Sequence, residues 1–174
     1  MMEASMNVQA TELKSEIKDE IKLGREEAIL QLVTFSLGGE EFALEILKVQ
    51  EINRMVDITQ VPKTPHFVEG VINLRGKVVP VIDLGKRLGL RETEKTAQSR
   101  IMVVEVVGNT VGLIVDSVSE VLRLPAQTVE PAPPFVSSVE TEYIMGVGKV
   151  EGRLVILLDI NKVFGSEDVG AFAA

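Results

Sequence analysis

The stretch Leu32–Ile52, LVTFSLGGEEFALEILKVQEI, decides the fold, because the chain repeats its pattern at Ile101–Val121, IMVVEVVGNTVGLIVDSVSEV. The two stretches match without a gap at an offset of 69 residues, and apolar residues fall on the same positions in both. Further along, Phe67–Gly89 matches Tyr143–Gly165 at an offset of 76. The chain therefore contains one building block of roughly 70 residues twice in tandem. A residue type found in both copies is expected to be scaffold, and one found in a single copy is a candidate for function.

Length, charge and cysteine content narrow the class of protein. The chain has 174 residues, a net charge of −8 and no cysteine. Without cysteine there is no disulfide framework and no thiol chemistry, which suits a reducing cytosol. The negative charge argues against nucleic acid or an anionic lipid surface as the main partner. Apolar stretches such as Val78–Ile82 are far shorter than the ~20 residues of a membrane-spanning helix, so we expect no membrane insertion.

The apolar pattern predicts strands. Val33, Phe35 and Leu37 alternate with Thr34 and Ser36, and this period of two marks a half-buried strand. Two-residue hairpin turns are predicted at four places, namely Gly38-Gly39, Gly108-Asn109, Arg75-Gly76 and Glu151-Gly152. Positive φ is expected at the shared glycines of the last two turns. The proline-containing segments Arg54–His66 and Arg123–Glu142 are predicted to be loops or edge segments.

Each copy then ends in the same way. Asp83 and Asp159 each stand three residues before a lysine, which predicts an aspartate N-cap on a short helical turn. About five short strands and one helical turn per copy favour an all-β fold with two small closed barrels. The predicted parts are a charged N-terminal tail (1–27), a first barrel copy (28–97), a second barrel copy (98–165) and a C-terminal tail (166–174).

Residues for catalysis are scarce. His66 is the single histidine and follows a proline, so a surface or packing role is favoured over a base, and no second histidine or cysteine is available for a metal site. No nucleophile elbow or Walker loop is present. A dinucleotide fingerprint begins at Gly146 but fails at Glu151, where a third glycine belongs. We expect no catalytic, cofactor-binding or metal residues, and a binding module is the favoured class.

Comparison of the copies singles out one hairpin. Arg75 aligns with Glu151, whereas the following glycine is shared, so the turn itself does not require an arginine. A recognition arginine at the loop tip is one interpretation, and a solvated arginine on a turn is the other. Val49 and Glu51 are repeated at Val118 and Glu120 and therefore indicate scaffold, unless both copies kept a binding surface.

Several motifs together resemble a known family. The segments that carry the resemblance are EFALEILKVQEI (41–52), FVEGVINLRG (67–76), VVPVIDL (78–84), GLIVDSVSEVL (112–122), EPAP (130–133) and TEYIMG (141–146). These resemble the CheW family of chemotaxis coupling proteins over about Leu30–Phe164. The long charged N-terminal tail is not part of the family pattern.

The resemblance implies two SH3-like five-stranded β-barrels and a non-catalytic adaptor in bacterial chemotaxis. Its implied partners are the regulatory domain of the histidine kinase CheA, the cytoplasmic tip of methyl-accepting chemoreceptors, and other CheW copies in an array. The implied location is the cytoplasm, at the inner face of the membrane. The receptor and kinase interface then maps to Val49, Glu51, Gly70, Asn73, Leu74, Arg75 and Gly76.

Two alternatives stay open at the level of the sequence. The chain can be a CheW-like regulatory domain taken from a CheA kinase. In a different class, it can be a barrel that binds a small ligand. The sequence also leaves open whether the two barrels exchange strands.

Overall fold

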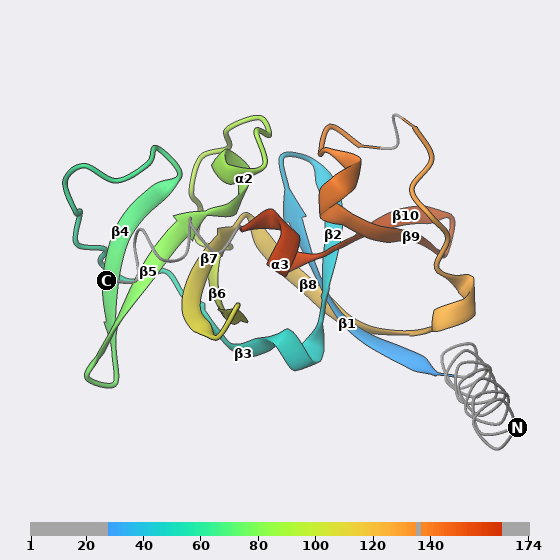
Figure 1. Cartoon of the computed structure of the whole chain (residues 1–174), viewed down its shortest axis with the longest axis horizontal. Coiled ribbons are helices and arrows are strands. Elements are labelled where there is room, and N and C mark those ends of the chain that lie inside the picture. The colour runs from blue at the N-terminus through green and yellow to red at the C-terminus, as the bar shows by residue number, and fades with distance from the viewer. Residues whose placement is uncertain (1–27, 135–136, 165–174) are drawn as a thin grey trace, which may run out of the picture.

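A computed structural model describes residues 28–134 and 137–164 as two curled β-sheets side by side (Figure 1). The predicted tails, 1–27 and 166–174, lie outside these residues. The strands of the first repeat are β1 (Ile29–Leu37), β2 (Glu40–Glu45), β3 (Val49–Arg54), β4 (Val68–Leu74) and β5 (Lys77–Asp83). Those of the second are β6 (Arg100–Val106), β7 (Asn109–Val115), β8 (Ser117–Pro125), β9 (Ile144–Val150) and β10 (Arg153–Leu158). Short helices are η1 (Ile46–Lys48), α2 (Leu84–Arg87), η2 (Ala126–Thr128), η3 (Thr141–Tyr143) and α3 (Ile160–Val163).

The two barrels exchange strands between the repeats. Barrel A has the strand order β8-β1-β2-β10-β9, and barrel B has the order β3-β6-β7-β5-β4. Each barrel thus joins two strands of one repeat to three of the other. The division at residue 97 separates the repeats in sequence and does not separate the barrels, which corrects the predicted domains 28–97 and 98–165. Periodicity could not reveal the exchange, because equivalent strands of the two repeats carry the same apolar pattern.

All four hairpins have a two-residue turn with glycine at its second position. Both turn residues have positive φ at Gly38-Gly39, Arg75-Gly76 and Glu151-Gly152, so the expectation for Gly76 and Gly152 is confirmed. The prediction of a Gly108-Asn109 turn is wrong, because the turn residues are Val107 and Gly108, with φ of 48° and 79°. This one-residue shift keeps glycine at the second turn position in every hairpin, as the gapless alignment requires.

Three apolar clusters hold the described residues together. The largest lies between the barrels and includes Phe35 and Phe42 of barrel A with Val104 and Leu113 of barrel B. Smaller clusters fill the inside of each barrel. Strand β1 therefore has cover on both faces, and Thr34, predicted to face solvent, is 0% exposed. Its hydroxyl donates to the Glu120 carbonyl at 3.2 Å, which satisfies the buried group.

The helical turns and loops lie where the sequence predicts them. Asp83 caps α2 by accepting from the Lys86 amide, and Asp159 caps α3 by accepting from two backbone amides. The described residues of the predicted loop segments, 55–67, 126–134 and 137–143, contain no strand apart from two isolated bridges. Within the described residues, no helix is both long and apolar enough to cross a membrane.

Candidate partner-binding site

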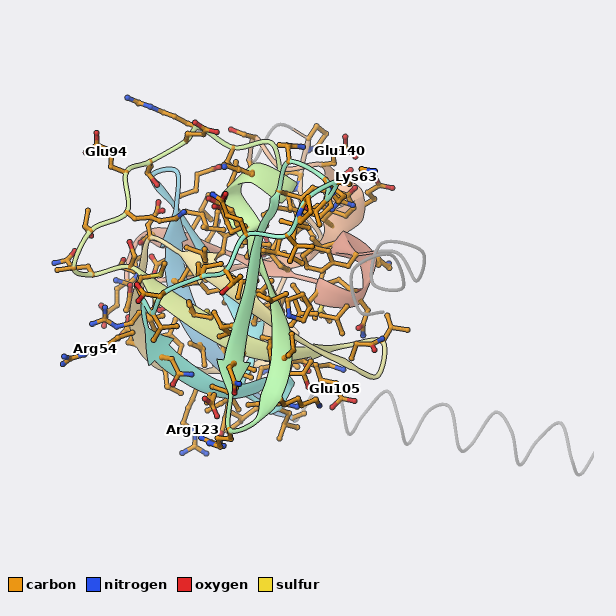
Figure 2. All side chains as sticks on the ribbon, turned by 90° about the vertical axis from the view of Figure 1, so that its left-hand side faces the viewer. Arg54, Lys63, Glu94, Glu105, Arg123 and Glu140 are labelled. Carbon is orange, nitrogen blue, oxygen red and sulfur yellow. The ribbon has the colours of Figure 1, made fainter. Side chains whose placement is uncertain are left out.

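The candidate site lies at the open seam of barrel B. Strands β3 and β4 are the two edges of this sheet, and a groove of about 670 Å³ lies between them. Glu51 and Asn53 of β3 line one side of the groove, and the segment from Ile72 to Arg75 lines the other. Arg54, which also lines the groove, projects from the end of β3 (Figure 2). The groove therefore brings together the two sequence regions that the family resemblance points to.

An ion pair spans this seam. The Arg75 Nη2 atom is 2.8 Å from Glu51 Oε2, and the side chains of Arg75 and Glu51 are 80% and 20% exposed. The other carboxylate oxygen of Glu51 accepts from Asn53 Nδ2 at 2.6 Å. Arg75 is thus paired across the seam rather than simply solvated, yet most of its guanidinium still faces water. An exposed planar fork of donors can bind a carboxylate of a partner in addition.

Asn73 and Gly76 shape the turn that carries Arg75. The Gly76 amide donates to Asn73 Oδ1 at 2.9 Å and closes the turn. Arg75 has φ of 55°, a region that a non-glycine residue adopts only under local constraint. No atom lies within 4 Å of a Cβ built on Gly76, so its need for glycine is purely conformational. These two residues therefore present Arg75 without crowding it.

Gly70 supports the groove by letting the backbone of a neighbouring loop pack closely against β4. It is buried, with φ of 147°, and a Cβ at this position would lie 2.1 Å from the Thr59 carbonyl oxygen. This close approach lets Thr59 and Val71 exchange backbone hydrogen bonds of 2.9 and 2.8 Å, which fix the loop beside β4. Gly146 plays the same part in barrel A, where Glu130 comes close. Gly70 is therefore a structural residue of the groove and not part of its surface.

Val49 and Leu74 are half-buried supports. Val49 packs against the core between the barrels, and Leu74 packs against the interior of barrel B while also lining the groove. Of the seven residues that the resemblance indicates, Glu51, Asn73, Leu74 and Arg75 therefore line the groove, and the other three do not.

Barrel A has a matching ion pair built from a different position. Glu120, the counterpart of Glu51, contacts Arg153, whose Nε atom is also 3.3 Å from Glu41 Oε2. Arg153 aligns with Lys77 at the offset of 76, whereas the counterpart of Arg75 is Glu151. Both barrels thus pair the edge-strand glutamate with an arginine of the hairpin, which a position-by-position comparison could not show.

Sequence reasoning missed Asn53. At the offset of 69 it aligns with Leu122, which packs against the interior of barrel A. Asn53 therefore gives the groove of barrel B a polar side chain where barrel A has an apolar one. The comparison of copies that singled out Arg75 could also have found Asn53.

A second surface, on barrel A, was also missed. A groove of about 270 Å³ is lined by apolar and polar side chains in equal number, namely Leu44, Met145, Leu158 and Ile160 with Glu45, Lys48, Asp159 and Asn161. Leu47, in η1 between Leu44 and Lys48, is 91% exposed. Its counterpart at the offset of 69 is Asp116, so an apolar residue here is not required by the fold. From the sequence alone, Leu47 cannot be distinguished from the leucines that are buried in the core.

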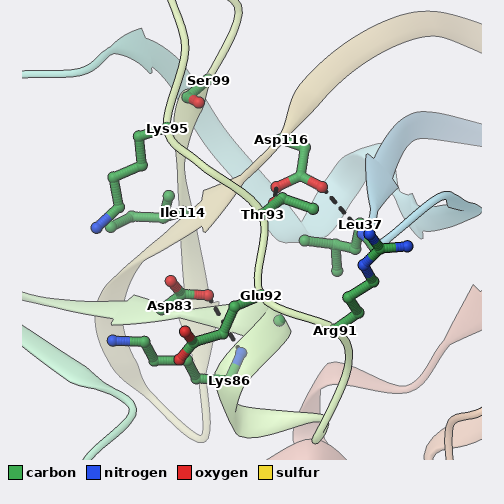
Figure 3. A pocket seen from close by; sticks show the side chains of 12 residues that line it. Leu37, Asp83, Lys86, Arg91, Glu92, Thr93, Lys95, Ser99, Ile114 and Asp116 are labelled. Carbon is green, nitrogen blue, oxygen red and sulfur yellow. Dashed lines mark hydrogen bonds between the residues drawn. The ribbon is translucent and has the colours of Figure 1, made fainter.

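A small charged pocket lies beside α2, and several of its charged side chains are paired (Figure 3). Its volume of about 20 Å³ suffices for a single water. Asp116 accepts from the Gly38 amide and from Thr93. Glu69 binds Lys86 at 2.8 Å and Lys95 at 3.4 Å. These contacts fasten the segment between the repeats.

Two carboxyl groups of this region have shifted pKa values. Burial raises the pKa of Asp83, against the opposing hydrogen bond from the Lys86 amide. Burial also acts to raise the pKa of Glu69, but its contacts with Lys86 and Lys95 outweigh that effect and lower it. In residues 28–134 and 137–164, no cluster of three potential ligands fit for a metal ion is found.

Comparisons with known proteins agree on one family. The model of the CheW-like domain matches residues 31–168. The chemotaxis protein CheW of Klebsiella aerogenes is 39% identical over 148 residues, which cover 85% of this chain and 89% of that protein. The CheW of Rhizobium meliloti is 38% identical over 138 residues, covering 79% and 89%.

A solved structure is similar as well. The crystal structure of the scaffolding protein TtCheW from Thermoanaerobacter tengcongensis superimposes with a TM-score of 0.74 at 40% identity, covering 81% of this chain and 91% of that one. This likeness confirms the predicted fold class of tandem SH3-like β-barrels. The chain belongs to the CheW family of chemotaxis scaffold proteins.

Proposed function

We propose that this protein is a non-catalytic adaptor that couples methyl-accepting chemoreceptors to the histidine kinase CheA in a chemotaxis array. The observation that carries the proposal is the presence of two chemically different surfaces on barrels that share one core. One is the seam of barrel B with its Arg75–Glu51 pair, and the other is the groove of barrel A beside the exposed Leu47. An adaptor needs two separate surfaces on one body to hold two partners together.

The character of each surface suggests how it binds. The seam of barrel B combines paired charges and amides over an apolar floor that includes Ile72 and Leu74, which suits a folded partner with a polar contact region. The groove of barrel A has charged residues beside its apolar ones, with exposed Leu47 and Met145, and therefore suits an amphipathic helix. We therefore propose that the CheA regulatory domain contacts the seam and that the receptor tip contacts the groove of barrel A.

The receptor and kinase interface proposed from the sequence is refined accordingly. Glu51, Asn73, Leu74 and Arg75 are proposed as contact residues, because they line the seam. Val49, Gly70 and Gly76 are proposed to support that surface without forming its main contacts. Location at the inner face of the membrane would follow from binding to receptors.

Binding measurements with purified partners test this assignment. Arg75→Glu is expected to weaken binding to CheA and to leave receptor binding unchanged, and Leu47→Asp is expected to do the reverse. Wild-type affinity of both variants for both partners would contradict the proposed surfaces.

A thermal-shift screen against nucleotides and metabolites addresses the small-ligand alternative. A ligand present at 100 times its dissociation constant would add about 2.7 kcal/mol to the free energy of unfolding. We expect no such stabilisation.

A further inference from the structure

Arg87 lies where the two barrels meet, and aromatic rings from both surround its guanidinium. The Arg87 Cζ atom is 5.3 Å from the centroid of the Phe67 ring, 5.6 Å from that of Tyr143 and 5.8 Å from that of Phe164. The whole chain has six phenylalanines, one tyrosine and no tryptophan. Three of these few rings therefore gather around one cation, at distances typical of cation–π contacts.

Each ring is fixed to its own barrel. The Phe67 carbonyl accepts from the Asp83 amide at 2.8 Å, at the end of β5 in barrel B. The Tyr143 carbonyl accepts from the Asp159 amide at 2.9 Å, beside β10 of barrel A. Phe164, fully buried, directly follows α3 on the same barrel. Because Arg87 belongs to α2, which follows β5, its contacts with Tyr143 and Phe164 cross from barrel B to barrel A.

The second repeat indicates that packing alone does not require an arginine here. At the offset of 76, Arg87 aligns with Val163, which is fully buried in the core between the barrels. An apolar side chain is therefore sufficient at the equivalent place in α3. Arg87 is found in only one copy, which makes it a candidate for a role beyond filling space.

The chemistry of the interface suggests that role. The core between the barrels is apolar, and hydrophobic attraction is non-directional, so polar contacts between the barrels, such as the Val107 amide donating to Asn161 Oδ1, add directionality to it. A planar guanidinium stacked on rings of both barrels has a defined geometry. We propose that Arg87 is a clasp that fixes the orientation of barrel A relative to barrel B. This property belongs to the chain alone and does not depend on the proposed coupling function.

Distance measurements on the isolated protein test the clasp. Because the chain has no cysteine, Lys77→Cys and Lys149→Cys place one spin label on an exposed position of each barrel without background labelling. Pulsed dipolar EPR is expected to give one narrow distance distribution for the labelled wild type. In Arg87→Leu the distribution is expected to broaden or shift. Arg87→Lys, which keeps the charge but lacks the planar fork, is expected to behave like Arg87→Leu.

Arg91→Leu is the matched control, because it removes the same charge from an exposed position in the following loop. Its distribution is expected to match that of the wild type. An unchanged distribution in Arg87→Leu would overturn the clasp. Should Arg87→Leu fail to fold, Arg87→Lys and Tyr143→Leu decide instead, and wild-type distributions in both would overturn the proposal. Since no partner is present, the result does not depend on whether the coupling function is right.

Discussion

Arg75 and Arg153 each form an ion pair with a glutamate on an edge strand, although the two arginines stand at non-equivalent positions of the two repeats. Each barrel has a glutamate on an edge strand, Glu51 or Glu120, and each glutamate is paired with an arginine of the neighbouring hairpin. The sequence comparison correctly marked Arg75 as unshared but could not reveal its partner. The pairing depends on how far a long side chain reaches between strands that are distant in sequence, and residue spacing contains no information on that reach.

Arg75→Ala tests the site at this scale. Because the Arg75 side chain is 80% exposed, its ion pair is expected to contribute little, and the free energy of unfolding should change by about 0.5 kcal/mol or less. Binding to CheA should weaken by about 1 kcal/mol or more, as at an interface hot spot. Urea unfolding and titration calorimetry measure the two quantities. Arg153→Ala serves as the matched control, and a large loss of stability with unchanged binding would show that Arg75 is structural.

Gly70 and Gly76 are predicted to differ, although both lie at positive φ. In Gly70→Ala the new methyl group meets the Thr59 backbone, so the loop must move, and we expect a cost of about 2 kcal/mol or more. In Gly76→Ala nothing is close, and only backbone strain of about 1 kcal/mol is expected. Urea unfolding of both variants provides the measurement. Equal costs would contradict the distinction between a packing glycine and a turn glycine.

At the scale of the elements, the position of the turn between β6 and β7 shows where residue preference fails as a predictor. Residue preference alone predicts a turn at Gly108-Asn109, whereas the gapless alignment predicts it one residue earlier. The structure follows the alignment, because register between β6 and β7 is set by apolar residues along both strands. Val107 is consequently forced to φ of 48°, which is unfavourable for a β-branched residue.

Val107→Asn should therefore stabilise the protein. Asparagine followed by glycine is the preferred pair for this turn type, and relief of strain is expected to raise the free energy of unfolding by about 1 kcal/mol. The Val107 side chain is exposed, so little packing is lost, and the backbone hydrogen bond to Asn161 Oδ1 can persist. Thermal and urea unfolding measure the change. A destabilised variant would mean that the valine side chain makes contacts worth more than the strain.

At the scale of the whole molecule, the exchange of strands makes one body out of two repeats. The strands, the caps and three of the four hairpin turns could be predicted because each depends on neighbours in sequence. The pairing of β2 with β10 and of β5 with β7 joins strands from different repeats, and the alternative pairing within each repeat has the same local pattern. The grooves could not be predicted either, since they exist only between elements that this pairing brings together.

The central claim is that this one body holds a receptor and a kinase together. Receptor-dependent CheA autophosphorylation, measured across a titration of this protein, tests that claim most directly. Activation is expected to require all three components and to rise with the adaptor concentration. Excess adaptor should then reduce it, as separate binary complexes replace the bridged one, unless cooperative array contacts hold the assembly together. Full activation of CheA by receptor without this protein would contradict the account.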